Sequence, residues 1–174
     1  MNQENPTYYY GLSSKVQAIV LATEVCDVLG HGANHRAVNL LLETAAAETC
    51  LGTYEDPTPG SAGMGLCQID YIAFVDIQRR TRPHLVKRIK QELGYNIQNV
   101  MHVDLIADPK LCFIFCRLHY LLRPEEIPLS LRGRAEYWKQ FYNSQAGKGT
   151  VQHYLQNAGA FLYRLTPDEL AGAQ

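Results

Sequence analysis

Two glutamates in the stretch 36–49 are the residues of this sequence best placed for acid–base chemistry. The stretch has the periodicity of an α-helix, in which each residue turns by about 100° from its neighbour. Glu48 joins the apolar stripe of this predicted helix, which otherwise consists of Ala37, Leu41, Thr44 and Ala45. Glu43 falls beside Arg36 and Asn39, on a face whose simplest interpretation is a solvated one. A carboxylate on an apolar stripe is desolvated, which raises its pKa and suits a general acid.

A glycine-rich loop, GSAGMGLCQID at residues 60–70, follows this helix. Its glycines at positions 60, 63 and 65 let the backbone turn tightly and pass close to a ligand without a Cβ in the way. No hydrophobic strand precedes the loop and it contains no GK[ST], so it does not have the pattern of a phosphate-binding loop. Asp56 and Asp70 flank it, and either carboxylate could serve catalysis or form a turn.

Three ordered motifs resemble those of the lysozyme-like superfamily, in particular goose-type lysozymes and lytic transglycosylases. Glu48-Thr49 followed by GLCQID at 65–70 is similar to the Glu-Ser and Gly-Leu-Met-Gln signatures of these enzymes. Farther along the chain, Tyr142-Asn143 and AGKGTV at 146–151 resemble their Tyr-Asn-Ala-Gly-x-Gly-x-Val segment. In this chain, residues 144–145 (SQ) stand between the two halves of that segment.

The resemblance implies cleavage of the β-1,4 bond between N-acetylmuramic acid and N-acetylglucosamine in peptidoglycan. Glu48 would protonate the glycosidic oxygen; the alternative is that it is a structural residue at a helix end. A hydrolase that inverts needs a second carboxylate to activate water, and Asp70 is favoured over Asp56 for this role. A lytic transglycosylase needs only the one acid. We expect hydrolysis ahead of transglycosylation, with a non-catalytic virion component or an inhibitor or adaptor as further alternatives.

The resemblance also implies which residues line the cleft and what they contact. Substrate contacts are expected from Gly65, Gln68, Tyr142 and Asn143. Tyr142 would touch the acetamido group of the sugar or position Glu48. The partner is then a peptidoglycan glycan strand, and no cofactor is required.

Length, composition and charge exclude several other classes of protein. The chain has 174 residues, of which 47% are hydrophobic, and this fits one domain over residues 1–174, with 1–12 draped over it or loosely held. The net charge is −1, so no basic face for nucleic acid is expected. Five cysteines are an odd number at irregular spacing, which does not match a secreted disulfide scaffold.

The N-terminal residues MNQENPTYYYGLSS have neither a basic n-region nor an apolar h-region of a signal peptide. No stretch of the sequence has the roughly 18–20 apolar residues that a membrane-spanning helix needs. We therefore expect synthesis in the cytoplasm and action on the bacterial cell wall, reached by phage lysis, in a virion or through a secretion machine.

Two groups of possible metal ligands have weak spacing. His31 and His35 lie four apart, but the glycines of HGANH argue against a helix there. Cys112, Cys116 and His119 share one face of a predicted helix and lack a fourth ligand, and cysteines are ordinary small core residues. The sequence predicts no metal site.

The rest of the chain has mostly helical periodicity. A first helix is predicted from Ser13 or Ser14 to Leu29, because Val16, Ile19, Val20 and Thr23 have helical spacing. Further helices are predicted at Tyr71–Arg82, from Pro83 to Gly94, from Asp108-Pro109 to Arg123, at Ala135–Tyr142 and at Thr150–Asn157. The helix after Pro109 is apolar on nearly all sides and is expected to be central. Trp138 and its aromatic neighbours are more often core residues than site residues.

The predicted helices leave one irregular region and one concentration of positive charge. Residues 50–70 are expected to be irregular or a β-hairpin, so the fold class is α+β, mostly α-helical, with a lysozyme-like cleft implied by the resemblance. The basic cluster is formed by Arg79, Arg80, Arg82, Lys87, Arg88 and Lys90. A solvated face is its simplest interpretation, and attraction to anionic cell-wall or membrane polymers is the alternative.

Overall fold

The computed structural model describes residues 6–57, 62–143 and 147–164. This part of the chain is mostly helical with a small antiparallel hairpin, so the α+β class is confirmed. The α-helices are α1 (Lys15–Leu29), α2 (Ala37–Thr49), α3 (Tyr71–Arg80), α4 (Pro83–Arg88), α5 (Pro109–Leu121), α6 (Leu131–Trp138) and α7 (Val151–Ala158). Shorter helical turns are η1 (Ile89–Leu93), η2 (His102–Ile106), η3 (Lys139–Asn143) and η4 (Gly159–Tyr163). In the hairpin, β1 (Gly63–Met64) pairs with β2 (Ile69–Asp70), with Gly63 opposite Asp70.

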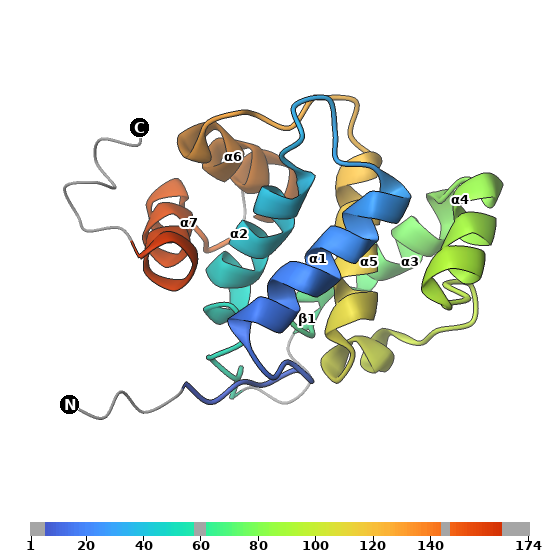
Figure 1. Ribbon diagram of the computed structural model, residues 1–174, viewed down its shortest axis with the longest axis horizontal. Helices are drawn as coiled ribbons and strands as arrows, with labels where there is room; N and C mark the ends of the chain where they lie inside the picture. The colour runs from blue at the N-terminus through green and yellow to red at the C-terminus, as the bar shows by residue number, and fades with distance from the viewer. Residues whose placement is uncertain (1–5, 58–61, 144–146, 165–174) are drawn as a thin grey trace.

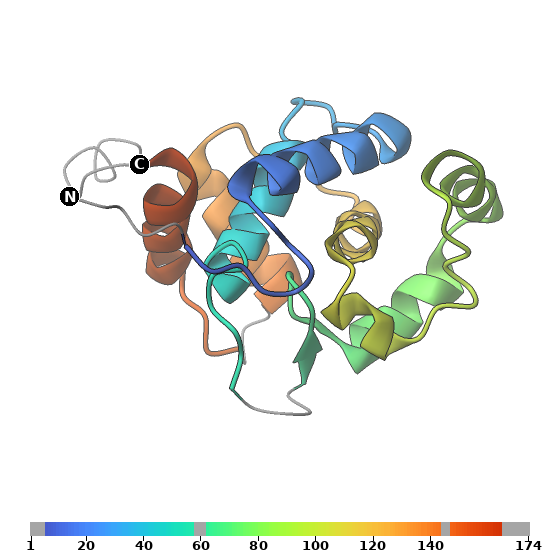
Figure 2. The same cartoon turned by 60° about the horizontal axis from the view of Figure 1, so that its bottom comes forward.

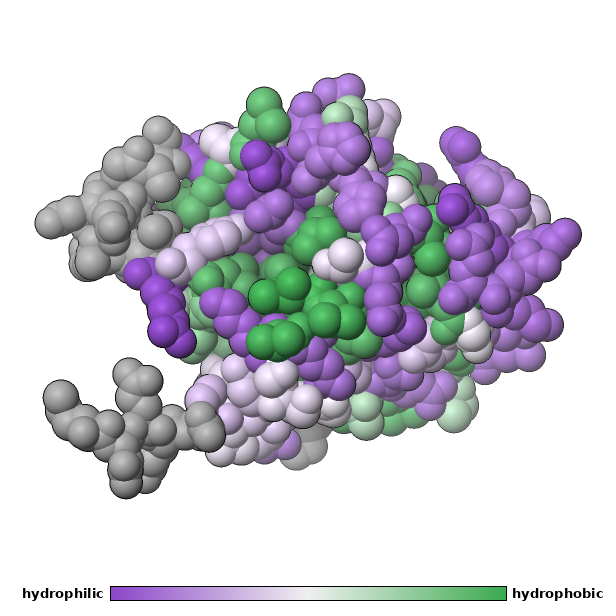
Figure 3. Space-filling view, in the orientation of Figure 1, coloured by the Kyte–Doolittle hydropathy of each residue, from purple (hydrophilic) through white to green (hydrophobic). Residues whose placement is uncertain are grey.

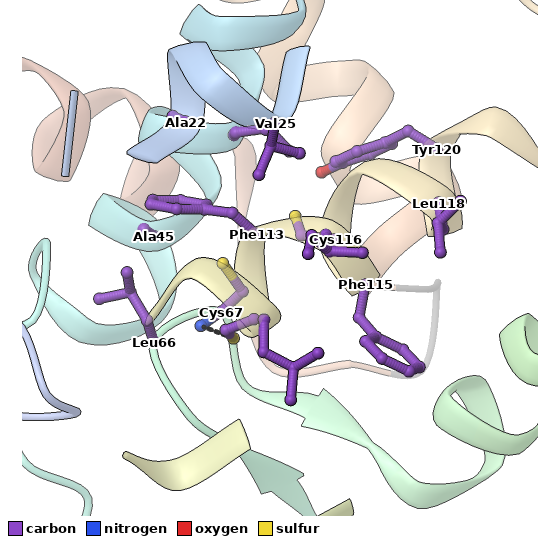
Figure 4. Close-up of a cluster of buried hydrophobic side chains, with 14 of the residues drawn as sticks. Ala22, Val25, Ala45, Leu66, Cys67, Phe113, Phe115, Cys116, Leu118 and Tyr120 are labelled. Atoms are coloured by element: carbon purple, nitrogen blue, oxygen red, sulfur yellow. Dashed lines mark hydrogen bonds between the residues drawn. The ribbon is translucent and has the colours of Figure 1, made fainter. Parts of the chain in front are cut away.

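Helix α5 is the centre of the molecule, as its apolar sequence predicts (Figure 1). It starts where expected, because the Asp108 carboxylate accepts from the Leu111 N–H at 2.9 Å and Pro109 occupies the first turn. Phe113 and Cys116 are fully buried, and Phe115 stacks on Phe74 of α3 with ring centroids 4.6 Å apart. Figure 4 shows these side chains converging with residues of α1, α2 and the 65–68 loop.

Helix α1 crosses α5 (Figure 1) and buries one of its faces against the core. Its ends are as predicted: the Ser14 hydroxyl accepts from the Gln17 N–H at 3.0 Å, and Gly30 follows with φ of 90°. The face against the core is formed by Ala18, Ala22, Val25, Cys26, Val28 and Leu29. Val16, Ile19 and Val20, on the other side of the helix, keep exposures of 69%, 40% and 48%. Ridge-into-groove packing against α5 therefore decides which apolar residues of α1 are buried.

The prediction that Glu43 is solvated is wrong. Glu43 is 0% exposed, because α6, α7 and η4 cover that side of α2. Its carboxylate accepts two hydrogen bonds from the Arg134 guanidinium, at 2.7 and 2.8 Å. The hydroxyls of Tyr154 and Tyr163 donate to the same carboxylate at 2.8 and 2.5 Å. A charge with this many partners is fully compensated, so the polar face is an internal contact.

The segments around α3, α4 and α6 agree with the predicted helices except at one boundary. Helix α3 ends before Pro83, and α4 continues through η1 to Gly94, whose φ is 84°. Helix α6 begins at Leu131, earlier than the predicted Ala135, because the Ser130 hydroxyl caps the Gly133 N–H at 3.0 Å. Within the described ranges, no helix is both long and apolar enough to cross a membrane.

Candidate active site

Glu48 lies in the last turn of α2, where the chain leaves the helix through an abrupt reversal. Cys50, Leu51 and Gly52 follow with positive φ angles of 52°, 55° and 78°. Such a run of left-handed residues persists only where the surroundings hold it. The Thr49 hydroxyl donates to the Leu66 carbonyl at 2.8 Å. This bond keeps the Glu48 end of α2 beside the glycine-rich loop.

The carboxyl group of Glu48 has a single protein hydrogen-bond donor among the described residues. The side chain is partly exposed, yet burial of the carboxyl raises the pKa of Glu48 from 4.5 to about 7. The Trp138 indole N–H donates to Glu48 Oε1 at 3.1 Å, and it opposes this rise because it stabilises the carboxylate. No Lys or Arg in the described ranges forms an ion pair with Glu48. Glu48 can therefore hold a proton near neutral pH and donate it.

Trp138 is the site residue that the sequence analysis missed. It is only 1% exposed and its ring meets Tyr154 at a centroid distance of 5.2 Å. A Cβ at position 149 would overlap the Trp138 ring, so Gly149 lets the downstream loop pack directly on the indole. Its signal was visible: Trp138 stands one helical turn before Tyr142, the first residue of the third motif.

The glycine-rich loop is held by its own backbone and by η2. Gly65 is buried with φ of 74°, and a Cβ there would overlap the carbonyl oxygen of Leu105. Gln68 also has a positive φ, 48°, and its side-chain amide donates to the Gly65 carbonyl at 3.0 Å. The close approach that Gly65 permits is thus to protein backbone, while Gln68 stays partly exposed at the loop surface. Gly60 lies outside the described residues.

Tyr142 links the third motif to the second. Its hydroxyl donates to the Cys67 carbonyl at 2.6 Å, so this O–H is already engaged by the loop. Its ring packs edge-on against His119 at 4.9 Å and stacks with Tyr120 at 5.4 Å. Burial raises the pKa of Tyr142 well above its usual value, with further contributions from nearby groups that include Glu48. The Tyr142 hydroxyl therefore holds the glycine-rich loop, and among the described contacts no hydrogen bond joins it to Glu48.

Asn143 ends η3, a π-helical turn, and belongs to a small polar junction. Its side-chain oxygen accepts from the Lys139 ammonium at 2.9 Å, and the same ammonium donates to the Gly147 carbonyl at 2.8 Å. Added Cβ atoms at Gly147 and Gly149 would both overlap Asn143. The two halves of the third motif therefore pack together in space, although residues 144–146 between them lie outside the described ranges.

The two aspartates have different surroundings. Asp70 is exposed and its Oδ1 accepts from the Ala73 N–H at 2.7 Å, which makes it the N-cap of α3. Asp56 is partly buried, and its N–H donates to the Tyr10 hydroxyl at 2.9 Å. Tyr9 donates from its N–H to the Gly52 carbonyl at 2.8 Å, so the N-terminal segment packs along the same turn.

An open groove of about 610 Å³ lies between α3 and the C-terminal end of α5. Asp70 and His119 line it, and His119 also contacts the Tyr142 ring. Tyr71 and Ile72 line the same groove with exposures of 63% and 82%. Of the candidate site residues, Asp70 lines this groove, whereas Glu48, Gln68 and Tyr142 do not.

The candidate metal ligands have other partners. His31 Nε2 lies 2.8 Å from Asp27 Oδ1, and His119 Nε2 lies 2.9 Å from the Phe141 carbonyl. Cys112 Sγ accepts from the Cys67 N–H at 3.2 Å within the core. In the part of the chain that the structure describes, no group of three or more His, Cys, Asp and Glu is placed to hold a metal ion.

The three motifs meet although about a hundred residues separate the first from the last. The bond from Thr49 to Leu66 joins the first motif to the second, and the bond from Tyr142 to Cys67 joins the second to the third. At the end of the first motif, the Glu48 carboxyl has a raised pKa and accepts a hydrogen bond from the neutral Trp138 indole. Comparison of the chain with models of protein families, with curated proteins and with solved structures finds no match.

Proposed function

We propose that this protein degrades peptidoglycan, cleaving the β-1,4 bond between N-acetylmuramic acid and N-acetylglucosamine with Glu48 as general acid. The observation that carries the proposal is the Glu48 carboxyl: burial raises its pKa to about 7, and its one hydrogen-bond donor among the described residues is the neutral Trp138 indole. The resemblance of three motifs that meet at this acid supports a lysozyme-like fold and a glycan strand as the substrate. The site of action would then be the bacterial cell wall, reached by phage lysis, in a virion or through a secretion machine.

The chemistry begins with proton transfer from Glu48. Protonated Glu48 donates to the glycosidic oxygen as the bond to C1 of muramic acid breaks, and N-acetylglucosamine leaves with a free 4-hydroxyl. The oxocarbenium-like sugar is then attacked at C1 either by water or by its own 6-hydroxyl. The Glu48 carboxylate takes up the proton of the attacking hydroxyl in the second case, so the acid is restored.

The capping role of Asp70 favours transglycosylation as the second candidate outcome. An inverting hydrolase needs a carboxylate that orients water, and the two carboxyl groups stand about 6.5–9.5 Å apart in such enzymes. Asp70 Oδ1 is engaged by the Ala73 N–H, which ties this carboxylate to the start of α3. A single-acid mechanism through the muramyl 6-hydroxyl requires no help from Asp70.

Mass spectrometry of digested peptidoglycan tests the function and separates the two outcomes. Hydrolysis leaves reducing muramic acid ends, whereas transglycosylation leaves 1,6-anhydro ends that are lighter by one water. Asp70→Asn keeps a side-chain oxygen for the cap, so it should fold normally. A hydrolase would lose about 10²–10⁴-fold in rate with this variant, and a transglycosylase would lose little. Failure of the parent protein to release any muropeptide would favour a non-catalytic virion component instead.

A further inference from the structure

The positive charge of the molecule is concentrated on α3 and the α4–η1 helix, away from Glu48 and Trp138, although Arg79 also lines the groove beside Asp70. Residues 76–93 contain six Lys and Arg side chains and two acids, a net charge of +4 in a chain whose total is −1. The other residues therefore sum to −5. Helix α4 and helix α7 lie at opposite ends of the long axis, and α6, which carries Trp138, lies on the α7 side (Figures 1 and 2). Figure 3 shows the α4 end covered by hydrophilic side chains.

Ion pairs neutralise part of this charge and, among the described ion pairs, leave Arg82, Lys87 and Lys90 without an acid, of which the two lysines line one groove. Asp76 binds both Arg79 and Arg80 at 3.0 Å, and Arg88 binds Glu92 at 2.9 Å. Within the described ranges, no ion pair joins Lys87 or Lys90 to an acid. Lys87 and Lys90 are exposed and lie three residues apart, so they project from one face of the α4–η1 helix.

The two lysines line a groove rather than a flat surface. The groove has a volume of about 510 Å³ and lies between α3, the α4–η1 helix and Gln98. Its walls are tied together, because Gln78 donates to the Ile97 carbonyl at 2.7 Å and Gln98 donates to the Gln78 carbonyl at 2.9 Å. The remaining lining is mixed: Arg79 and Thr81 are polar, whereas Pro83 and Val86 provide an apolar floor.

We propose that this groove binds a flexible phosphodiester polymer with a polyol or sugar backbone, which anchors the protein on an anionic surface layer. Lysine ammonium groups are point charges that suit phosphate, and a phosphodiester remains ionised at every physiological pH. A hollow with two free cations accepts a narrow hydrophilic chain. An anchor of this kind raises the local concentration of the protein around the polymer.

Two other polyanions fit the groove less well. Surfaces that dock on a bilayer insert exposed apolar and aromatic side chains, and residues 76–98, all of which the structure describes, contain no large exposed hydrophobic one. Single-stranded nucleic acid is held by aromatic stacking platforms, and no aromatic side chain lines this groove. The net charge of −5 on the other residues also opposes a long duplex.

Titration of fluorescently labelled poly(glycerol phosphate), followed by anisotropy at about 50 mM salt, tests the proposal. We expect the parent protein to bind, and Lys87→Gln/Lys90→Gln to weaken binding by about tenfold or more, from roughly fivefold per lysine. Lys87→Arg/Lys90→Arg should restore binding. The matched control is Lys110→Gln/Arg132→Gln, which removes two cations from exposed ion pairs elsewhere and should change affinity less than about twofold.

Four results would overturn the proposal. The first is that the parent does not bind the polymer, and the second is that the lysine-to-glutamine variant and the control variant weaken binding equally. The third is that phosphatidylglycerol vesicles bind as tightly at the same phosphate concentration and through the same lysines. The fourth is that single-stranded DNA binds as tightly and through the same lysines. The proposal does not rest on the glycosidase activity. The Glu48→Gln protein should bind the polymer as the parent does, so failure of either proposal is recognised independently of the other.

Discussion

Two carboxylates on helix α2, Glu43 and Glu48, lie five residues apart in opposite surroundings. Glu43 is fully buried and accepts four hydrogen bonds, two of them from the Arg134 guanidinium. Glu48 accepts one, from the neutral indole of Trp138. Glu43 is therefore compensated as an ion, while Glu48 is held as an acid with a pKa of about 7. The comparison teaches that the number and charge of the donors, rather than burial, decide whether a buried carboxyl is structural or reactive.

The same helix supplies the partners of both glutamates. Arg134 and Trp138 lie one turn apart on α6, so the ion pair with Glu43 fixes the helix that brings the indole to Glu48. Breaking a buried ion pair leaves one uncompensated charge, which is far more costly than losing a surface pair. The ion pair thus stabilises the position of Trp138 beside the proposed acid Glu48.

Glu48→Gln removes the proton donor and should have the largest effect on activity. We expect peptidoglycan solubilisation to fall by about 10²–10⁴-fold, the usual contribution of a general acid. Circular dichroism should show an unchanged fold. Glu136→Gln, on the exposed end of a surface ion pair, is the control and should retain full activity. Retained activity in Glu48→Gln would remove Glu48 from the mechanism.

Glu43→Gln should have the opposite effects: the folded state should lose stability, while the fraction of protein that remains folded should keep its activity on peptidoglycan. Arg134 would be left charged and 5% exposed without its carboxylate, which costs about 3–5 kcal/mol in free energy of unfolding. Urea denaturation measures this loss. The double variant Glu43→Met/Arg134→Met removes both charges and should recover much of it. Equal stability of the parent and Glu43→Gln would contradict the assignment of this pair as structural.

The stability of the two glutamate variants should also differ in sign and in pH dependence. The unfolded chain releases the Glu48 proton near pH 4.5, whereas the folded chain keeps it until about pH 7. The unfolded state therefore binds fewer protons in this window, and the parent loses stability as the pH rises through it. Glu48→Gln lacks this loss and should be more stable than the parent above pH 7, by about 1–3 kcal/mol. Urea denaturation midpoints of the parent and of Glu48→Gln, measured at about pH 4 and pH 8, test this difference in stability. If Glu48→Gln is less stable than the parent at about pH 8, Glu48 is a structural carboxylate.

Trp138→Phe should have the smallest effect, and it probes the single donor of Glu48. Activity should fall as the pH rises through the pKa of Glu48, about 7, in the parent. Loss of the indole N–H removes the contact that lowers this pKa, so the alkaline limb should move to higher pH. Tyr137→Phe, on the same helix with its hydroxyl bonded to the Glu125 carbonyl, should leave the limb in place. A pH profile that is unchanged in Trp138→Phe would show that the indole only packs.

Local sequence signals determined much of the secondary structure. Ser14 and Gly30 delimit α1, and Asp108-Pro109 opens α5, because a cap needs only the residues within one helical turn. The apolar sequence of α5 also predicted its central place correctly. The positions of Glu48, Gln68 and Tyr142 in short motifs are equally local, which is why these candidate residues were visible from the sequence.

Tertiary structure alone decided what surrounds each of these residues. Periodicity places Glu43 and Glu48 on different sides of α2, but it does not say that α6 and α7, whose contacts with Glu43 come 91 and 111 residues later, cover that side. The same reason hid Trp138, whose role depends on a partner 90 residues away. In α1 the spacing predicted a helix, whereas packing against α5 decided that the face with Ala18, Ala22 and Val25 is buried and that with Val16 and Val20 is exposed. A helix fixes angles between its own residues, and only its neighbours decide which of them meet water.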